Sequence, residues 1–375
     1  MYPNNAHIPH NLTELQNDIN KALAFDFSSV TTQKARRVLE RESLTVEDLA
    51  ALLSPAAENY LEPMAQRAMD LTKRFFGRNI NLFTPLYLSN YCLNLCAYCG
   101  FSFSNKIRRG RLNFLEIEKE LLAVKETGLK DILLLTGDNR AKSGPAYIAE
   151  AVKLAAGLFP SVGLEVYPLK TEEYAQVKKA GADYVCVYQE TYDPDLYGRV
   201  HLKGPKRDYL FRLESQSRAL SAGIRGASLG ALLGLGDFRR DVLAMGVHGL
   251  YLSRKFPASD LAYSVPRLRP VIGTRETFNE ISEKNLFQII LALRIFSPSF
   301  GLTLSTREQP SFRDRLMGIG VNRLSAGVST SVGGYAGEDH GDNQFLKSDS
   351  RDVGEVCRAV ITRGFQPVFT DYARL

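Results

Sequence analysis

The chain has 375 residues, 45% of them apolar and 23% charged, which is close to the globular average and excludes a mainly disordered, collagenous or coiled-coil chain. Lys and Arg outnumber Asp and Glu by 47 to 41, a net charge of +6 that is spread along the chain and does not imply nucleic-acid binding. The chain has no run of apolar residues as long as a membrane span and its start lacks the features of a signal peptide, so we expect no membrane association and a cytoplasmic location.

The first 78 residues predict helices. Thr45, with Asp48 three residues later, matches a capping box at a helix start, and apolar residues follow at helical spacing up to Pro55. A second amphipathic run covers residues 60–76. We therefore predict an N-terminal helical extension over residues 1–78 and a second unit over residues 79–375.

From residue 82 onward, short apolar runs alternate with longer amphipathic stretches, a pattern typical of repeated βα units around a parallel sheet. The predicted strands are 82–88, 131–136, 163–167, 184–188, 227–234, 262–265, 302–305 and 323–325. The predicted helices are 113–127, 145–157, 171–180, 209–222, 238–254, 282–295, 311–317 and 352–363. Eight such pairs favour an α/β fold of the (β/α)₈ TIM-barrel type over an open doubly wound sheet.

Barrel active sites lie at the carboxyl ends of the strands, so polar residues there are the candidates for function. The Gly- and Asp-rich segment 330–350 shows neither helical nor strand period. It is either a lid over the barrel mouth or a solvated connection.

Three of the five cysteines, Cys92, Cys96 and Cys99, follow the first barrel strand with the spacing C-x₃-C-x₂-C. Thiolates on one tight loop can each bind one iron of a [4Fe–4S] cluster and leave the fourth iron open for reaction. A structural zinc is the alternative, but it usually takes four ligands and no fourth Cys or His is near in sequence. Cys186 and Cys357 lie in apolar runs and are expected to be buried structural thiols.

The cysteine spacing, with the aromatic Tyr98 before the third cysteine, resembles the hallmark of the radical S-adenosylmethionine enzymes. The resemblance implies that the open iron binds S-adenosylmethionine, that Tyr98 contacts its adenine, and that one electron cleaves the sulfonium to give a 5′-deoxyadenosyl radical. Gly137 and Asp138, at the end of the second strand, are similar to the family's Gly-Glu motif for the cofactor amino group, with Asp in place of Glu.

Other polar residues near strand ends fit cofactor binding on the same barrel. Glu165 and Glu190 follow the third and fourth strands and are either acceptors for ribose hydroxyls or solvated carboxylates. Arg212, on the following helix, either pairs with the cofactor carboxylate or lies on the surface. His201 follows the fourth strand, but a lone histidine is more often structural.

Segments along nearly the whole chain are similar to those of the aromatic amino-acid lyases within this superfamily, above all to those that act on tyrosine. The segments are 85–90, 99–105, 188–192, 201–204, 266–270, 304–308 and 333–335. The resemblance implies cleavage of L-tyrosine at Cα–Cβ to p-cresol and 2-iminoacetate, which feeds thiazole assembly in thiamine biosynthesis. It also implies two partners, thiazole synthase and an electron donor of the flavodoxin or ferredoxin type. Residues 367–375 contain no cysteine, so a single cluster is expected.

A tyrosine site needs a carboxylate clamp, a dry pocket for the ring and a partner for the phenol oxygen. Arg307 at the end of the seventh strand is the first candidate for the clamp, because a planar guanidinium binds a carboxylate with two parallel hydrogen bonds. The alternative for Arg307 is an ion pair with Glu308 or Asp314. Further candidates for substrate binding are Ser305, Arg267 and Arg269.

Two other functions stay open on this reasoning. A lyase acting on tryptophan would share the cluster and the clamp and differ only in the ring pocket. A non-enzymatic iron–sulfur sensor or scaffold would hold a cluster without cleaving S-adenosylmethionine, and the strand-end carboxylates and Arg307 argue against it.

Overall fold

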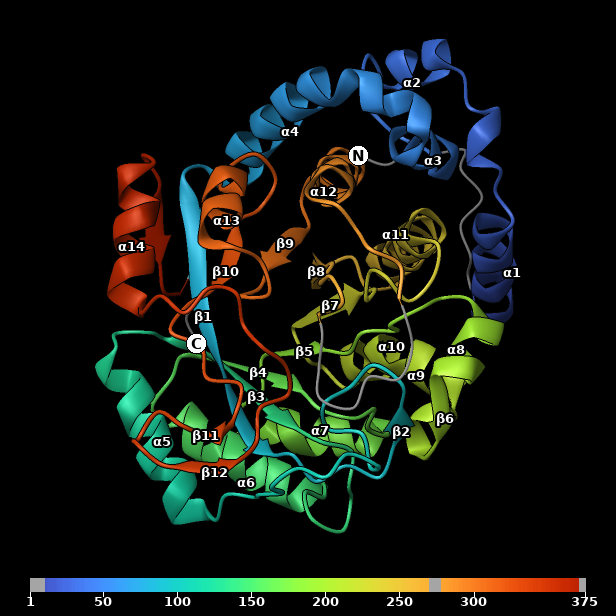
Figure 1. Ribbon diagram of the computed structural model, residues 1–375. Helices are drawn as coiled ribbons and strands as arrows, with labels where there is room; N and C mark the ends of the chain where they lie inside the picture. The colour runs from blue at the N-terminus through green and yellow to red at the C-terminus, as the bar shows by residue number, and fades with distance from the viewer. Residues whose placement is uncertain (1–10, 270–277, 371–375) are drawn as a thin grey trace.

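The computed structural model describes residues 11–269 and 278–370. Within those ranges, eight parallel strands close into a barrel, which confirms the predicted TIM-type fold (Figure 1). In barrel order they are β1 (Asn79–Ser89), β3 (Asp131–Thr136), β4 (Ser161–Glu165), β5 (Tyr184–Cys186), β7 (Gly226–Gly230), β8 (Asp260–Ser264), β9 (Gly301–Leu304) and β10 (Arg323–Ser325). Pairing of β10 with β1, in the register Leu82 to Leu324, closes the ring.

Helices surround the barrel on its outer side (Figure 1). They are α5 (Phe114–Glu126), α6 (Pro145–Ala156), α7 (Thr171–Ala180), α8 (Pro194–Val200), α9 (Tyr209–Leu213), α10 (Ser215–Ser221), α11 (Phe238–Lys255), α12 (Glu283–Phe296), α13 (Pro310–Leu316) and α14 (Val353–Thr362). Capping boxes led by Asn113 and Asp352 start α5 and α14. The helix predicted over 209–222 is two helices, because Glu214 leaves helical geometry at ψ 0°.

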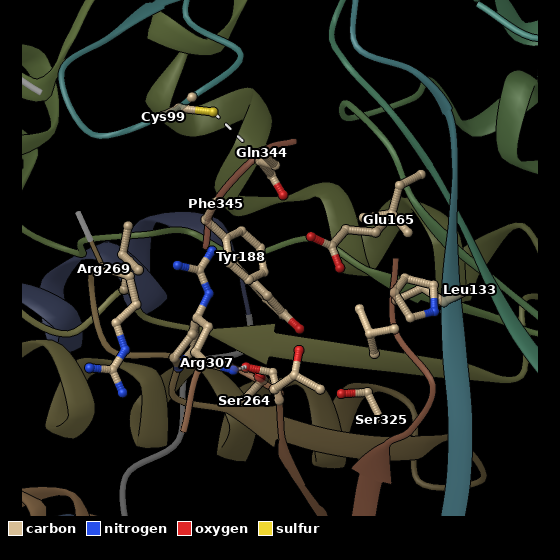
Figure 2. A pocket seen from close by; sticks show the side chains of 18 of the residues that line it. Cys99, Leu133, Glu165, Tyr188, Ser264, Arg269, Arg307, Ser325, Gln344 and Phe345 are labelled. Carbon is tan, nitrogen blue, oxygen red and sulfur yellow. Dashed lines mark hydrogen bonds between the residues drawn. The ribbon is translucent and has the colours of Figure 1, made fainter. Parts of the chain in front are cut away.

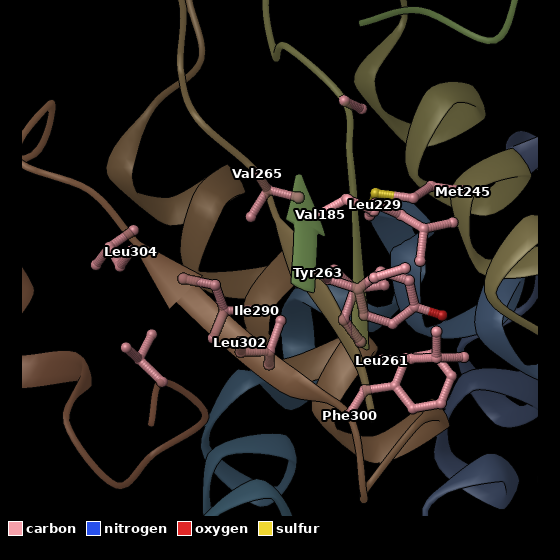
Figure 3. Packing of buried hydrophobic residues seen from close by; sticks show 14 of the residues in the cluster. Val185, Leu229, Met245, Leu261, Tyr263, Val265, Ile290, Phe300, Leu302 and Leu304 are labelled. Carbon is pink, nitrogen blue, oxygen red and sulfur yellow. The ribbon is translucent and has the colours of Figure 1, made fainter. Parts of the chain in front are cut away.

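The core lies between the outer face of the strands and the helices that cover it. Figure 3 shows this layer where Leu229 of β7 and Tyr263 of β8 pack near Met245 of α11 and Ile290 of α12. The strands are buried on both faces, which explains why they appear in the sequence as short continuous apolar runs.

The N-terminal segment packs against one side of the barrel. Its helices are α1 (Leu12–Leu23), α2 (Thr32–Val38), α3 (Val46–Leu53) and α4 (Leu61–Phe76). Helices α1, α3 and α4 pack against α11 or α12, and α2 packs against α3 (Figure 1). The predicted capping box is present, since Thr45 accepts from the Asp48 backbone N–H and the Asp48 carboxylate accepts from that of Thr45. The apolar residues of these helices join the barrel core, and the division at residue 78 stays a prediction.

The segment 330–350 contains two short strands, so the expectation of a strand-free loop is wrong. Strand β11 (Val332–Gly333) pairs with β1, and β12 (Asp339–Gly341) returns antiparallel to β11. The buried Glu120 carboxylate of α5 accepts hydrogen bonds from the backbone N–H groups of Tyr335 and Ala336. The segment then brings Gln344 and Phe345 over the barrel mouth, as the lid alternative requires.

Two smaller pairings complete the sheet structure. Strand β13 (Gln366–Val368) joins the start of β1, and β2 (Leu95–Cys96) pairs antiparallel with β6 (His201–Lys203). No helix in the described ranges is long and apolar enough to cross a membrane.

Candidate active site

Two adjoining chambers open at the carboxyl ends of the barrel strands. The cysteine chamber is lined by Cys92, Cys96, Cys99, Thr136, Gly137, Asp138 and Arg212, among others. The inner chamber lies deeper and is lined by Phe83, Pro85, Leu133, Ser264, Arg269, Thr303, Ser305, Arg307, Ser325 and Phe345, among others (Figure 2). The two share the residues Tyr87, Cys99, Leu135, Glu165, Tyr188, Glu190, Lys206 and Gln344. They are therefore continuous, and a molecule in one can touch a molecule in the other.

The loop that carries Cys92, Cys96 and Cys99, here called the cysteine loop, is held by two buried asparagines. Asn90 accepts from the Gly110 backbone N–H at 2.8 Å and donates to the Arg108 carbonyl at 3.0 Å. Asn94 donates to the Asp138 carboxylate at 2.8 Å and accepts from the Lys206 backbone N–H at 2.8 Å. These hydrogen bonds join the loop to segments from distant parts of the chain, so its conformation is fixed before any ligand binds.

The three cysteine thiols suit an iron–sulfur cluster better than a single metal ion. All three line the same chamber, yet no three His, Cys, Asp or Glu side chains in the described residues are arranged to hold one ion. Cluster ligands each bind a different iron and so need to be farther apart than the ligands of one zinc ion. Cys186, also buried, lines the same chamber from β5, and Cys357 is half-buried on α14.

Tyr98 is fixed by His201. The Tyr98 hydroxyl lies 2.8 Å from Nε2 of His201, and the other ring nitrogen, Nδ1, lies 2.9 Å from the Tyr197 carbonyl. Burial, with the nearby Lys206 and Arg212 cations, lowers the pKa of His201 to about 2, so the ring is neutral. Nδ1 then carries the proton and donates to the carbonyl, and Nε2 accepts from Tyr98. His201 is therefore a structural residue, as a lone histidine more often is.

The end of β3 lies against the cysteine loop. A Cβ on Gly137 would come within 2.3 Å of the Tyr91 carbonyl oxygen, so only glycine allows this close approach. The Asp138 carboxylate lines the chamber and is held by Asn94. The hydroxyl of Thr136 is buried in the same wall with no hydrogen-bond partner among the described residues. Sequence reasoning did not single out Thr136.

A buried charge network lies between the chambers. Lys206 donates to Glu190 at 2.7 Å, and Arg212 lies 3.6 Å from the same oxygen. Burial alone would raise the pKa of Glu190, but these two cations outweigh it and hold the pKa below its ordinary value. Arg212 is only 8% exposed, so the surface alternative for it is wrong. Burial, and then the neighbouring Glu190, raise the pKa of Glu165 to about 7.

The backbone of Glu190 is also unusual. Its φ of 73° makes it the sole residue other than glycine with positive φ in the described ranges. Such a conformation costs free energy and persists where the surrounding structure fixes it, most often at functional sites. Here it aims the carboxylate at Lys206, in the wall that both chambers share.

Arg307 enters the inner chamber without a carboxylate partner in the part of the chain that the structure describes. Its guanidinium lies 3.6 Å from the centre of the Phe345 ring. The predicted alternatives for it are wrong, since Glu308 pairs with Arg267 and Arg269 while Asp314 pairs with Arg351. Burial lowers the pKa of Arg307, although the neighbouring Tyr87, Glu190 and Glu165 oppose this.

The other predicted substrate residues divide into two groups. Ser305 and Arg269 line the inner chamber, whereas Arg267 is not among its lining residues. Arg267 instead donates through Nε to Glu308 at 3.0 Å and through a second nitrogen to the Ile281 carbonyl at 2.7 Å. The structure therefore brings Ser305, Arg269 and Arg307 together at one cavity and leaves Arg267 behind its wall.

Sequence analysis also missed four further side chains that line the chambers, those of Tyr188, Lys206, Gln344 and Phe345. Lys206 and Tyr188 lie in or next to segments quoted for the family resemblance, so the signal was present for both. Gln344 and Phe345 lie in a segment without period and reach the chamber only through tertiary contacts. No local pattern marks them.

The family comparisons agree with this geometry. Residues 86–245 match the family model of the Radical SAM superfamily. Residues 264–366 match that of the Biotin and Thiamin Synthesis associated domain. The 2-iminoacetate synthase of Salmonella typhimurium is 43% identical over 344 residues, 91% of each chain, and that of Escherichia coli is 43% identical over 343 residues, also 91% of each.

A solved structure of a similar protein has the same fold. The [FeFe]-hydrogenase maturase HydG from Carboxydothermus hydrogenoformans superposes with a TM-score of 0.87 and 31% identity, covering 96% of this chain and 86% of its own. The match extends through both chambers, because it covers almost all of the chain.

Proposed function

Since this chain belongs to the 2-iminoacetate synthase family of radical S-adenosylmethionine enzymes, we propose that it cleaves L-tyrosine between Cα and Cβ into 2-iminoacetate and p-cresol. Methionine and 5′-deoxyadenosine are the products of S-adenosylmethionine in the same reaction. The observation that carries the proposal is a half-buried arginine, Arg307, with no carboxylate partner among the described residues, in a chamber continuous with a three-cysteine chamber. The 2-iminoacetate serves thiazole assembly in thiamine biosynthesis.

Cys92, Cys96 and Cys99 would hold the [4Fe–4S] cluster. When bound, the cluster supplies the electron that cleaves S-adenosylmethionine and starts the radical reaction. The buried Tyr98, which lines the inner chamber next to Cys99, offers a flat apolar face for adenine. Asp138 and the unpartnered Thr136 hydroxyl offer polar contacts in the adjoining cysteine chamber. Glu165, Glu190 and Arg212 would bind the remaining polar groups.

The chain's own side chains supply substrate orientation. Arg307 binds the tyrosine carboxylate through two parallel hydrogen bonds, and Ser305 stands beside it in the same wall. Phe345 covers the guanidinium, which keeps water from this ion pair. Apolar walls from Pro85, Leu133 and Leu135 receive the ring.

The electron donor would dock where the cysteine loop meets solvent. Leu93, Phe103 and Leu202 are exposed apolar residues on and beside this loop, and the exposed Lys203 and Arg207 add positive charge. An apolar patch edged with cations suits an acidic protein of the flavodoxin or ferredoxin type. Thiazole synthase as a partner and a cytoplasmic location stay predictions.

One anaerobic incubation tests the proposed reaction. Reconstituted protein with tyrosine, S-adenosylmethionine and a reductant should yield p-cresol together with 5′-deoxyadenosine. A parallel incubation with tryptophan should yield 5′-deoxyadenosine at most, without fragments of the indole side chain. Side-chain fragments from tryptophan and none from tyrosine would assign the enzyme to the other aromatic substrate.

A further inference from the structure

Ser325 carries a buried hydroxyl that the fold does not use. The residue ends β10, is 3% exposed and lines the inner chamber. Its Oγ has no hydrogen-bond partner in the described ranges, whereas its carbonyl accepts from the buried Arg313. A buried hydroxyl without a hydrogen-bond partner lowers stability, so its presence here indicates that a ligand atom forms the missing hydrogen bond.

The position of Ser325 is deeper in the barrel than that of the clamp. Leu324 pairs with Leu304, so Ser325 lies at the level of residue 305, two residues before Arg307 along the neighbouring strand. In β1, Phe83 is its partner in register. Figure 2 shows Arg307 and Ser325 on opposite sides of the chamber, with the Ser325 hydroxyl turned toward the chamber.

The lining of the inner chamber changes character with depth. A cation, Arg307, lies at the mouth, and apolar side chains such as Pro85 and Leu133 form the walls. The other two serine hydroxyls of the chamber are already engaged, since Ser305 accepts from the Arg307 backbone N–H at 3.4 Å and Ser264 is hydrogen-bonded to Tyr188. Among the serine hydroxyls of this chamber, the one with no partner in the described residues is therefore that of Ser325.

We propose that Ser325 binds the phenol oxygen of tyrosine and so sets the preference for tyrosine over phenylalanine. The inference rests on the proposed function. Tyrosine has a charged end, an apolar ring and one polar atom at the far end of that ring, the same order that the chamber shows from Arg307 to Ser325. A site that hydrogen-bonds a hydroxyl of the substrate binds an analogue without that hydroxyl poorly, because the polar group of the protein then stays unpaired.

The test is equilibrium dialysis of tyrosine and of phenylalanine against the reconstituted enzyme with S-adenosylmethionine and no reductant, so that no turnover occurs. Wild type should bind tyrosine roughly 10-fold or more tightly than phenylalanine, the scale of one buried hydrogen bond. Ser325→Ala should bring this ratio to within about threefold, mainly by weakening tyrosine binding. Its thermal midpoint without substrate should be equal to or above that of wild type, because no hydrogen bond within the protein is lost.

Two variants serve as controls. Ser228→Ala removes a buried serine of β7 that does not line the inner chamber and should keep the wild-type ratio. Thr303→Val removes another hydroxyl that lines the inner chamber, from β9, and should also keep most of the wild-type ratio. A wild-type preference retained in Ser325→Ala, or lost in Thr303→Val alone, would overturn the assignment of Ser325. Equal binding of both amino acids by wild type would overturn the proposed preference, and no measurable binding of tyrosine by wild type would overturn tyrosine as the substrate as well.

Discussion

Tyr98 and His201 form a buried pair in which the tyrosine hydroxyl donates to the neutral imidazole at 2.8 Å. The Lys206 ammonium lies 5.4 Å from the centre of the Tyr98 ring, on the side of the charge network. The pair links the cysteine loop to β6, so the orientation of the aromatic ring is fixed by a residue far away in sequence.

Replacing Tyr98 by Ala should weaken binding of S-adenosylmethionine by roughly 1–3 kcal/mol, the scale of one lost aromatic stack. Iron content should stay the same, because the cysteines are untouched. Tyr98→Phe keeps the ring and loses only the bond to His201, so it should fall between wild type and Tyr98→Ala. Affinity measured by equilibrium dialysis decides this, and an unchanged value in Tyr98→Ala would mean that the ring only packs.

Iron analysis tests the cluster ligands. Anaerobically reconstituted protein should hold about four irons per chain. Cys92→Ala, Cys96→Ala and Cys99→Ala should each lose the cluster, while Cys186→Ala and Cys357→Ala should keep it. Cys186→Ala is the sharper control, since this thiol lines the same chamber. About eight irons per chain would contradict a single cluster.

Most of the barrel was predictable because its signals are local. Strands such as 131–136 are continuous apolar runs between amphipathic helices, and the cysteine spacing lies within eight residues. The hairpin β11–β12 was not predictable, because what fixes it is a carboxylate, Glu120, about 215 residues earlier in the chain. Similarly, the sequence gives no sign that the helix expected over 209–222 breaks at Glu214.

For the site, the sequence indicated which residues could bind a ligand but not where their side chains point. Arg267, Arg269 and Arg307 all follow strand ends, and only tertiary structure separates them. Glu308 pairs with Arg267, which lies 41 residues earlier in the chain, so Arg307 stays available to a ligand. Ser325 shows the same limit, since nothing in its sequence context reveals that its hydroxyl lacks a partner.

Glu165 should make stability depend on pH in one direction. Its pKa in the folded protein is raised to about 7 from 4.5, so between these pH values the folded state holds more protons than the unfolded state. The stability of wild type relative to Glu165→Gln should therefore fall as pH rises from about 4.5 to 7, and then level off. Denaturant unfolding of both proteins without ligands at several pH values measures this. A relative stability that rises over this range would mean that the carboxylate is held by its cationic neighbours.

Arg267→Ala should lower the stability of the protein and leave the substrate site unchanged. Glu308 is 1% exposed and would lose its two-nitrogen partner, a loss of roughly 3–5 kcal/mol for a broken buried pair. Arg269→Ala is the matched control, because it leaves the Arg267 contacts with Glu308 in place and should cost less. Denaturant midpoints compare the two, and p-cresol formation per folded Arg267→Ala protein should stay near wild type. A stable but inactive Arg267→Ala would return this residue to the substrate site.

Arg307→Lys keeps the positive charge at the mouth of the inner chamber and removes the planar pair of donors. Cluster and cofactor are expected to depend on other residues, so 5′-deoxyadenosine should still form, whereas p-cresol should fall sharply because only substrate orientation depends on the clamp. A displacement of the reacting atoms by ~1 Å can lower a rate by ~10²-fold, which sets the scale of the effect. Lysine also lacks the flat face that Phe345 covers, so the remaining ion pair would be wetter and weaker. The measurement is the ratio of p-cresol to 5′-deoxyadenosine in wild type and variant. If both products fall by the same factor, Arg307 serves the cofactor or the fold, and the clamp passes to Arg269, the other arginine that lines this chamber in the described residues.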